Sequence, residues 1–292
     1  MVSTAVTGSA GPYRPTPLER QRRGVRSRRS HRSTLTALAS TLAVAGIAYV
    51  TITNAPGWPR VQASFFDPDV AWEYLPAILR GLWLNLRVLA VAAVLTVVLA
   101  LLLAVVRTLR GPVWVPLRLV ATVYVDFFRG VPLIVLLYLV GFGIPALRFT
   151  EGRISAVTLG TAAIVLTYSA YVSEVCRAGI DTVHPSQRLG ARSLGLSYAQ
   201  SMRLVVLPQA VRRVTPPLLN DFVAMQKDVG LISLLGAVDA VRAAQIGALE
   251  SFNFTPYVVA ALLFVALSVP TARLADWVTA RAARREQAGG VL

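Results

Sequence analysis

Long runs without a charged residue decide what this chain can fold into. About 20 consecutive apolar residues in a helix are enough to cross the hydrocarbon core of a bilayer. Uncharged runs of about this length occupy residues 34–53, 88–106, 130–147, 154–173 and 255–272. An entirely apolar helix of this length has no face for water, so a soluble protein rarely carries even one. These runs therefore predict an all-α integral membrane protein.

A sixth, weaker span is expected at residues 204–226, which contain Arg212, Arg213 and Asp221. On hydropathy alone this segment is also compatible with an amphipathic helix lying on the membrane surface. The composition agrees with a membrane protein, because 55% of the residues are hydrophobic and only 15% are charged. An average soluble domain has about 25% charged residues.

The arginines predict an orientation. Residues 1–33 form an Arg-, Gly-, Pro- and Ser-rich tail of the kind that stays disordered. Beside a membrane span such a tail is retained in the cytoplasm, so we expect a topological role rather than nucleic-acid binding. The basic region is long for a signal peptide. We therefore favour an uncleaved first transmembrane helix at residues 34–54.

The remaining loops can be tested against this orientation. The segments 107–118 and 177–203 carry an excess of arginine and fall inside, whereas 54–80, 148–153 and 227–250 fall outside. The C-terminal tail, residues 281–292, is basic and falls inside only if residues 204–226 cross the membrane. The chain is thus expected to have about six transmembrane helices, with both termini in the cytoplasm.

The inner loop at residues 182–203 predicts two short helices joined by a turn. Pro185 suits the first position of a helix, and Gly195 can adopt the left-handed conformation that ends one. Ser197 and Gln200 have the spacing of a capping box for the second helix. Pro208 follows within the second helical pattern, where it predicts a kink.

Three interpretations of this loop are open from its geometry. A DNA-binding helix-turn-helix also has a glycine turn, but two membrane spans would hold this one at the bilayer. The second interpretation is an amphipathic surface helix. The third is a docking helix that inserts into a groove on a cytosolic partner.

The stretch LGARSLGLSYAQSMRLVVLP, residues 189–208, resembles the EAA loop of ABC importer permeases. The family pattern is Glu-Ala-Ala, three residues, Gly, nine residues, then Ile-x-Leu-Pro. Matching positions are occupied by Ala191, Gly195, Val205 (for Ile), Leu207 and Pro208. Gly190 replaces the first alanine and Leu189 replaces the glutamate, which leaves the strength of docking open.

Four other segments resemble the polar amino acid permeases of this family. They are DFFRGVPLIVLLY (126–138), AYVSEVCRAGI (170–180), LPQAVRRVTPPLLNDF (207–222) and KDVGLISLLG (227–236). The similarity covers about residues 78–280, which we expect to form a five-helix type I importer core after an extra N-terminal helix. The extra helix and basic tail are similar to the glutamate-type permeases of actinobacteria.

The resemblance implies partners. Two permease copies, or this chain and a homologue, would form the pathway in contact with membrane lipid, and an extracytoplasmic binding protein would deliver the amino acid. ABC ATPase subunits would sit on the loop and bind ATP and magnesium, since this chain has no Gly-x-x-x-x-Gly-Lys-Ser/Thr loop and needs no cofactor of its own. The implied coupling residues are Ser186, Gln187, Arg188, Leu189, Gly190, Ala191, Arg192, Gly195, Leu196 and Ser197.

Ionisable residues at membrane depth are expensive and mark functional sites. Asp126 and Arg129 are three residues apart and are expected to pair on one helix face. Gly130 and Pro132 predict that the helix breaks, which would free backbone groups to hold an α-carboxylate or α-ammonium group. The alternative is that Asp126 and Arg129 only neutralise each other near the interface.

Two further groups are candidates. Asn220 and Asp221 follow a Pro-Pro pair within the weak span and are expected to face the substrate pathway. Lys227 and Asp228 close that span on the outer side, where a gate is expected, although KDVG departs from the family's KDTS. Glu174 and Arg177 are expected to form an interfacial pair that braces the coupling loop.

A carrier driven by an ion gradient is the alternative function, with an intramembrane carboxylate such as Asp221 as its coupling site. A membrane enzyme is disfavoured, because His31, His184 and the single Cys176 form no catalytic or metal-binding pattern. Which amino acid is carried stays open, since glutamate, glutamine, arginine and histidine all fit.

Overall fold

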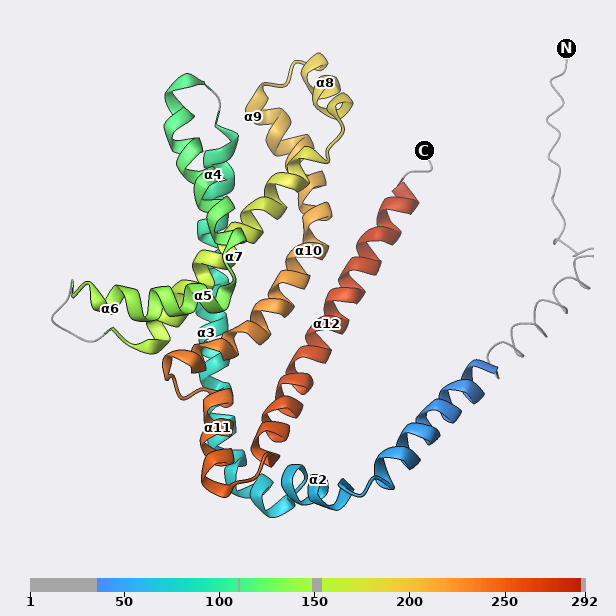
Figure 1. Ribbon diagram of the computed structural model, residues 1–292. Coiled ribbons are helices and arrows are strands. Elements are labelled where there is room, and N and C mark those ends of the chain that lie inside the picture. The colour runs from blue at the N-terminus through green and yellow to red at the C-terminus, as the bar shows by residue number, and fades with distance from the viewer. Residues whose placement is uncertain (1–35, 110, 149–153, 290–292) are drawn as a thin grey trace, which may run out of the picture. The chain divides into compact units, whose positions relative to one another are not determined.

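The computed structural model describes residues 36–109, 111–148 and 154–289, and within these ranges it contains helices and no strand (Figure 1). The chain divides into two compact units, residues 1–61 and 62–292. In the first unit the helix Thr36–Thr53 has a mean hydropathy of 1.6 and is long enough to cross a membrane, as predicted. The predicted tail at residues 1–33 lies outside the described residues.

The helices after this first span follow one another with short connections. In chain order they are α2 (Trp58–Phe65), α3 (Pro68–Thr108), the 3₁₀ turn η1 (Pro112–Trp114), α4 (Val115–Gly130), α5 (Leu133–Tyr138), the π turn η2 (Leu139–Gly143) and α6 (Ile144–Ala146). The second half contains α7 (Ala156–Asp181), α8 (Pro185–Ser193), α9 (Tyr198–Ser201), the π turn η3 (Met202–Val206), α10 (Leu207–Asp228), the 3₁₀ helix η4 (Val229–Leu235), α11 (Ala240–Ser251) and α12 (Thr255–Gly289).

The expected number of spans agrees with these helices. Four helices of the described residues are long and apolar enough to cross a membrane, and there are six spans if each of two bent pairs counts as one. The first pair, Pro112–Gly130 and Leu133–Ala146, bends by 108°. The bend lies at Val131 and Pro132, so the helix break predicted from Gly130 and Pro132 is confirmed.

Two segments that were expected to lie outside between spans are largely helical. Residues 54–80 contain α2 and the first turns of α3, which begins at Pro68 with Asp67 as its N-cap. Residues 227–250 contain η4 and α11. Hydropathy located only the apolar middle of α3, and α11 is too short and mixed in polarity to stand out. The segment 281–289 of the predicted C-terminal tail continues α12.

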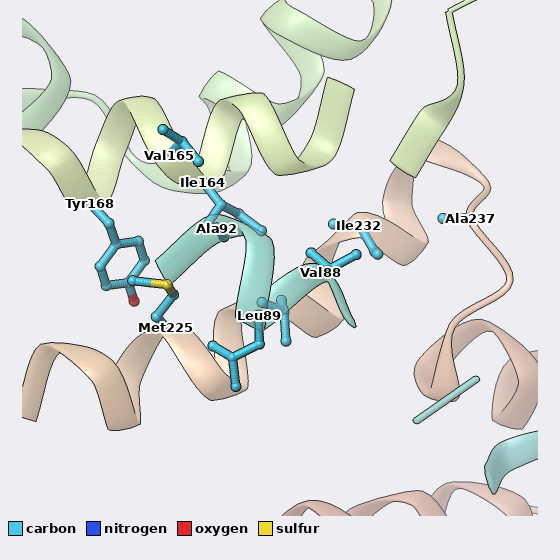
Figure 2. Packing of buried hydrophobic residues seen from close by; sticks show 10 residues of the cluster. Val88, Leu89, Ala92, Ile164, Val165, Tyr168, Met225, Ile232 and Ala237 are labelled. Atoms are coloured by element: carbon cyan, nitrogen blue, oxygen red, sulfur yellow. The ribbon is translucent and has the colours of Figure 1, made fainter. Parts of the chain in front are cut away.

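The core of the second unit forms where α3, α7, α10 and η4 meet. Figure 2 shows Leu89 and Ala92 of α3 among Tyr168 of α7, Met225 of α10 and Ile232 of η4. All five side chains are buried. This packing holds the polar residues of α7 and α10 at fixed positions beside α3.

A second contact joins α3 to α11 through small residues. Gly81 lies against the backbone of Asp239, so closely that a Cβ atom there would collide with it. Ala240, Ala243 and Ala244 of α11 are buried beside α3. The buried Asn85 amide donates to the Val229 carbonyl (3.2 Å) and to Asp239 Oδ2 (2.9 Å), and its oxygen accepts from the Ala240 amide (3.1 Å). Close helix approach and buried hydrogen bonds therefore position α11.

Candidate coupling and translocation site

The loop between α7 and α10 has the local structure that its residues predict. Pro185 begins α8, and Gly195 has a φ of +81°, which ends the helix in the left-handed region. The Ser197 hydroxyl accepts from the Gln200 amide (3.3 Å), and the Gln200 side chain accepts from the Ser197 amide (2.9 Å). The predicted capping box is thus confirmed. We call this end of the second unit, with α8 and α9, the coupling end; α11 lies at the opposite end (Figure 1).

The helix after the capping box enters the core through a π turn. The Leu207 amide donates to the Met202 carbonyl, five residues back, and α10 continues through Pro208. Since proline has no amide hydrogen, the wider turn is one way to pass it without ending the helix. The sequence predicted a kink here, and the structure places the irregularity at residues 202–206.

Two arginines bind the C-terminal end of α7, one from α8 and one from α10. Arg188 donates to the Ile180 carbonyl (2.6 Å), and Arg213 of α10 donates to the Thr182 carbonyl. The last carbonyls of a helix have no partner within it, so the two arginines satisfy groups that α7 leaves free. Ala191 is the buried residue on the inner face of α8.

The outer face of α8 and its turn is exposed and partly apolar. Leu189 is 64% exposed and Leu194 is 84% exposed. Of the predicted coupling residues, Arg188, Ala191 and Leu196 are not fully exposed, while Ser186, Gln187, Leu189, Gly190, Arg192, Gly195 and Ser197 are. Arg188 and Ala191 therefore hold the loop in place, and the other exposed residues form its outer surface.

An ion-pair network lies directly behind this loop. Glu174 pairs with Arg177 (2.5 Å), as the spacing predicted, and also with Arg107 of α3 (2.8 Å). Arg177 extends the network to Asp181 (2.7 Å). Sequence spacing does not indicate Arg107, because no local pattern connects two residues so far apart in the chain. The network connects α3 to the C-terminal end of α7, which is followed in the chain by α8.

The predicted pairing of Asp126 with Arg129 is wrong. Both side chains are exposed, and no ion pair joins them within the described residues. The Arg129 guanidinium lies 6.0 Å from the ring centre of Tyr171, and the Tyr171 hydroxyl donates to the Arg129 carbonyl (3.4 Å). Arg129 stands in the last turn of α4 before the Gly130–Pro132 break, where it lies beside the Tyr171 ring of α7.

The four polar candidates on α10 separate into two kinds. Asn220 and Lys227 are exposed, whereas Asp221 and Asp228 are half-buried. Asp228 accepts a hydrogen bond from the Tyr168 hydroxyl of α7 (2.8 Å). This contact links the middle of α7 to the end of α10 beside the predicted gate, and sequence spacing had not indicated Tyr168.

Asp221 lines a small cavity between α3, α7 and α10. The cavity has a volume of about 140 Å³, and its lining includes Thr96, Cys176 and Met225. Thr96 is only 1% exposed. Thr96 Oγ1 and Asp221 Oδ2 are both buried and have no hydrogen-bond partner among the described residues. Burying polar atoms without partners costs free energy, so this cavity is suited to bind a polar ligand.

Comparison with known proteins identifies the family. Residues 97–284 match the model of the family described as binding-protein-dependent transport system inner membrane component. The chain belongs to this family. It is 31% identical over 196 residues to the arginine transport system permease protein ArtQ of Bacillus subtilis (strain 168), covering 66% of this chain and 86% of ArtQ. It is 36% identical over 193 residues to the putative glutamine transport system permease protein GlnP of Rickettsia prowazekii (strain Madrid E), covering 65% and 86%.

Solved structures give the same result for this permease. The crystal structure of an amino acid ABC transporter with histidines matches with a TM-score of 0.68 and 32% identity, over 74% of this chain and 98% of that chain. An inward-facing conformation of the MetNI methionine ABC transporter matches with a TM-score of 0.54 and 21% identity, which supports the fold alone. The predicted family and fold class are confirmed.

Proposed function

We propose that this permease forms the translocation pathway of an ATP-driven importer for polar amino acids and couples to a separate ATPase through α8. The observation that carries the proposal is the construction of the coupling loop. Its outer face is exposed, Arg188 attaches α8 to the Ile180 carbonyl of α7, and Arg213 of α10 binds the Thr182 carbonyl at the start of the loop. A partner that moves α8 therefore also moves the two helices that carry the polar candidates.

The outer face of α8 favours an apolar contact with the ATPase. Leu189 stands where the family has glutamate, and the nearby Leu194 is more exposed still. Removing exposed apolar side chains from water is favourable in most protein–protein association. We expect the ATPase to present an apolar groove to these leucines. ATP and magnesium would bind to that subunit.

The polar groups of α7 and α10 suggest a route for the substrate. A zwitterion carries an ammonium group, for which Asp221 Oδ2 is a suitable acceptor, and Thr96 adds a hydroxyl to the same cavity. The hydrogen bond between Tyr168 and Asp228 fits a gate that must open for passage. The remaining pathway candidates are Asp126, Arg129, Gly130, Pro132, Asn220 and Lys227.

The rest of the assembly follows from the family and the names of its relatives. An extracytoplasmic binding protein would deliver the amino acid, and a second copy or a homologue would complete the pathway. Arginine, glutamine and histidine, which the names and title of the related proteins mention, are the first substrates to test. The arginine distribution supports an orientation with both termini in the cytoplasm.

The test is purification of the tagged permease from its native membrane, followed by mass spectrometry. We expect an ATPase subunit in near-equal amount, and its loss in the double variant Leu189→Asp, Leu194→Asp. Val113→Asp is the control, because Val113 is also apolar and 80% exposed but lies in η1, outside the loop. A preparation without ATPase from cells whose uptake depends on an ion gradient would support the alternative carrier.

A further inference from the structure

A groove of about 620 Å³ runs between α3 and α7. Its walls are mostly apolar, with Val91 and Leu95 on α3 and Ala162 and Leu166 on α7. Arg87 of α3 also lines it. The groove thus combines an apolar trough with one cationic group.

Arg87 is the polar group in this groove that is left available to a ligand. The Thr161 hydroxyl donates to the Val157 carbonyl (2.7 Å), and the Thr158 hydroxyl bonds that of Ser155 (2.8 Å). The Arg87 side chain is exposed and has no hydrogen bond or ion pair within the described part of the chain. A free guanidinium beside apolar walls would suit a ligand that carries an anionic group and an apolar chain.

The depth of Arg87 in the membrane points to that anion. The uncharged run 88–106 begins immediately after Arg87 and ends before Arg107. At 1.5 Å per residue the run is about 28 Å long, close to the roughly 30 Å of the hydrocarbon core. Arg107 lies at the coupling end, in the network with Glu174. Arg87 therefore lies at the level of the lipid phosphates at the opposite end.

The start of α7 adds a second attraction for negative charge. Ser155 caps this helix, and Val157 and Thr158 of its first turn line the same groove as Arg87. A helix N-terminus carries a partial positive charge and favours anions. The polar end of the groove is thus positive on both of its walls.

A second arginine extends this positive end. Arg80 and Arg87 both line a neighbouring groove of about 370 Å³, which shares Leu84 and Arg87 with the first. Seven residues of helix separate the two arginines by about 10 Å on one face of α3. Glu250 also lines this second groove, but it accepts from the Tyr74 hydroxyl (3.3 Å) and pairs with neither arginine.

We propose that the α3–α7 groove binds one anionic glycerophospholipid from the leaflet opposite the coupling end. Its phosphate meets Arg87 and the start of α7, its headgroup extends toward Arg80, and one acyl chain lies along Val91, Leu95 and Leu166. From Arg87 to Leu95 the helix rises about 12 Å, most of the roughly 15 Å depth of one leaflet. A choline headgroup would place its own positive charge beside the arginines, so a net negative lipid is preferred.

The experiment is native mass spectrometry of the purified permease after equilibration with dioleoylphosphatidylglycerol or dioleoylphosphatidylcholine. Wild type is expected to retain one phosphatidylglycerol in preference to phosphatidylcholine. Arg87→Gln and Arg80→Gln are each expected to weaken retention of phosphatidylglycerol about fivefold, because one arginine near an anionic lipid contributes about that factor. Arg148→Gln is the matched control, since Arg148 is exposed and lines neither groove.

Val91→Trp tests the contribution of the apolar groove to lipid binding separately from that of the charges. The larger side chain fills the groove and leaves both arginines in place. This variant is expected to lose both lipids while size-exclusion profiles and helical content stay those of wild type. Unchanged retention in Arg87→Gln would overturn the proposal, and so would equal retention of the two lipids by wild type. If Val91→Trp keeps its lipid and instead dissociates a dimer, a second copy of the chain occupies the groove.

Discussion

At the residue scale, the arginines of this permease serve three different purposes. Arg107 and Arg177 neutralise Glu174, and Arg188 and Arg213 bind carbonyls at the end of α7. Arg87 has no partner within the described residues and faces a groove. Arginine is abundant throughout the sequence, and the role of each arginine depends on which groups its guanidinium can contact.

Replacing Arg188 with Gln tests whether this side chain holds α8. The shorter side chain loses the bond to the Ile180 carbonyl, and a hydrogen bond from a charged donor contributes about 1.5–3 kcal/mol. The amides of α8 are expected to exchange with deuterium about tenfold faster or more in a mass-spectrometric assay. Arg192→Gln is the control, because Arg192 is exposed on the same helix. Equal exchange in both variants would contradict the role assigned to Arg188.

Thr96→Val tests the polar cavity beside Asp221. Valine has nearly the same shape, and the Thr96 hydroxyl is buried without a partner in the part of the chain that the structure describes. Removing it is expected to stabilise the fold by about 1 kcal/mol, seen as a higher thermal midpoint in detergent. If the cavity receives the substrate, the same variant also transports more slowly. A lower midpoint would show that the hydroxyl has a structural partner.

At the element scale, α8 is defined by how it starts, how it stops and which face it buries. Pro185 starts it, Gly195 stops it in the left-handed region, and Ala191 anchors it. Apart from the partly buried Arg188, the rest of its surface is exposed. A short helix of this kind is stabilised mostly by its contacts, because helices of fewer than about 12 residues are marginal alone.

Two glycine variants test the contribution of the turn at Gly195 separately from that of the helix α8. Gly195→Ala places a Cβ atom at a φ of +81° and is expected to cost about 1 kcal/mol, reducing ATPase retention. Gly190→Ala is expected to be neutral or slightly stabilising, because its Cβ would meet nothing within 4 Å and glycine is a poor helix former. The measurement is the amount of ATPase that copurifies with each variant. Similar losses in both would indicate that the loop tolerates no change on this surface.

At the scale of the whole molecule, α3 connects the two ends of the second unit. Toward one end it packs on α11 through Gly81 and Asn85, and at the coupling end Arg107 pairs with Glu174. Between these contacts it shares the core with α7, α10 and η4 (Figure 2). A movement imposed on the coupling loop therefore reaches a helix that runs through the whole unit.

Gly81→Ala is expected to be among the more damaging small changes in the chain. The added methyl group would collide with the backbone of Asp239, which cannot rotate away as a side chain can. Overpacking of this kind costs about 1–3 kcal/mol. The thermal midpoint in detergent should fall clearly, whereas Gly143→Ala, with nothing within 4 Å, should leave it nearly unchanged. A wild-type midpoint for Gly81→Ala would show that α11 can move away from α3 at little cost.

The sequence by itself determined the features that depend on neighbouring residues or on the bilayer. Uncharged runs must be in helices within lipid, because each unpaired backbone group there is costly. The capping box at Ser197, the left-handed Gly195 and the break at Pro132 follow from local chemistry in the same way. The motif match to the permease family also needed no coordinates.

Only the tertiary structure decided which distant residues meet. It paired Glu174 with Arg107, turned Arg188 inward and placed Tyr171 rather than Asp126 beside Arg129. It also brought Thr96 to Asp221 and placed α11 against α3. These contacts join segments tens of residues or more apart, or depend on which way a side chain turns. Spacing along a helix predicts neighbours on that helix, whereas contacts between helices depend on how the helices pack.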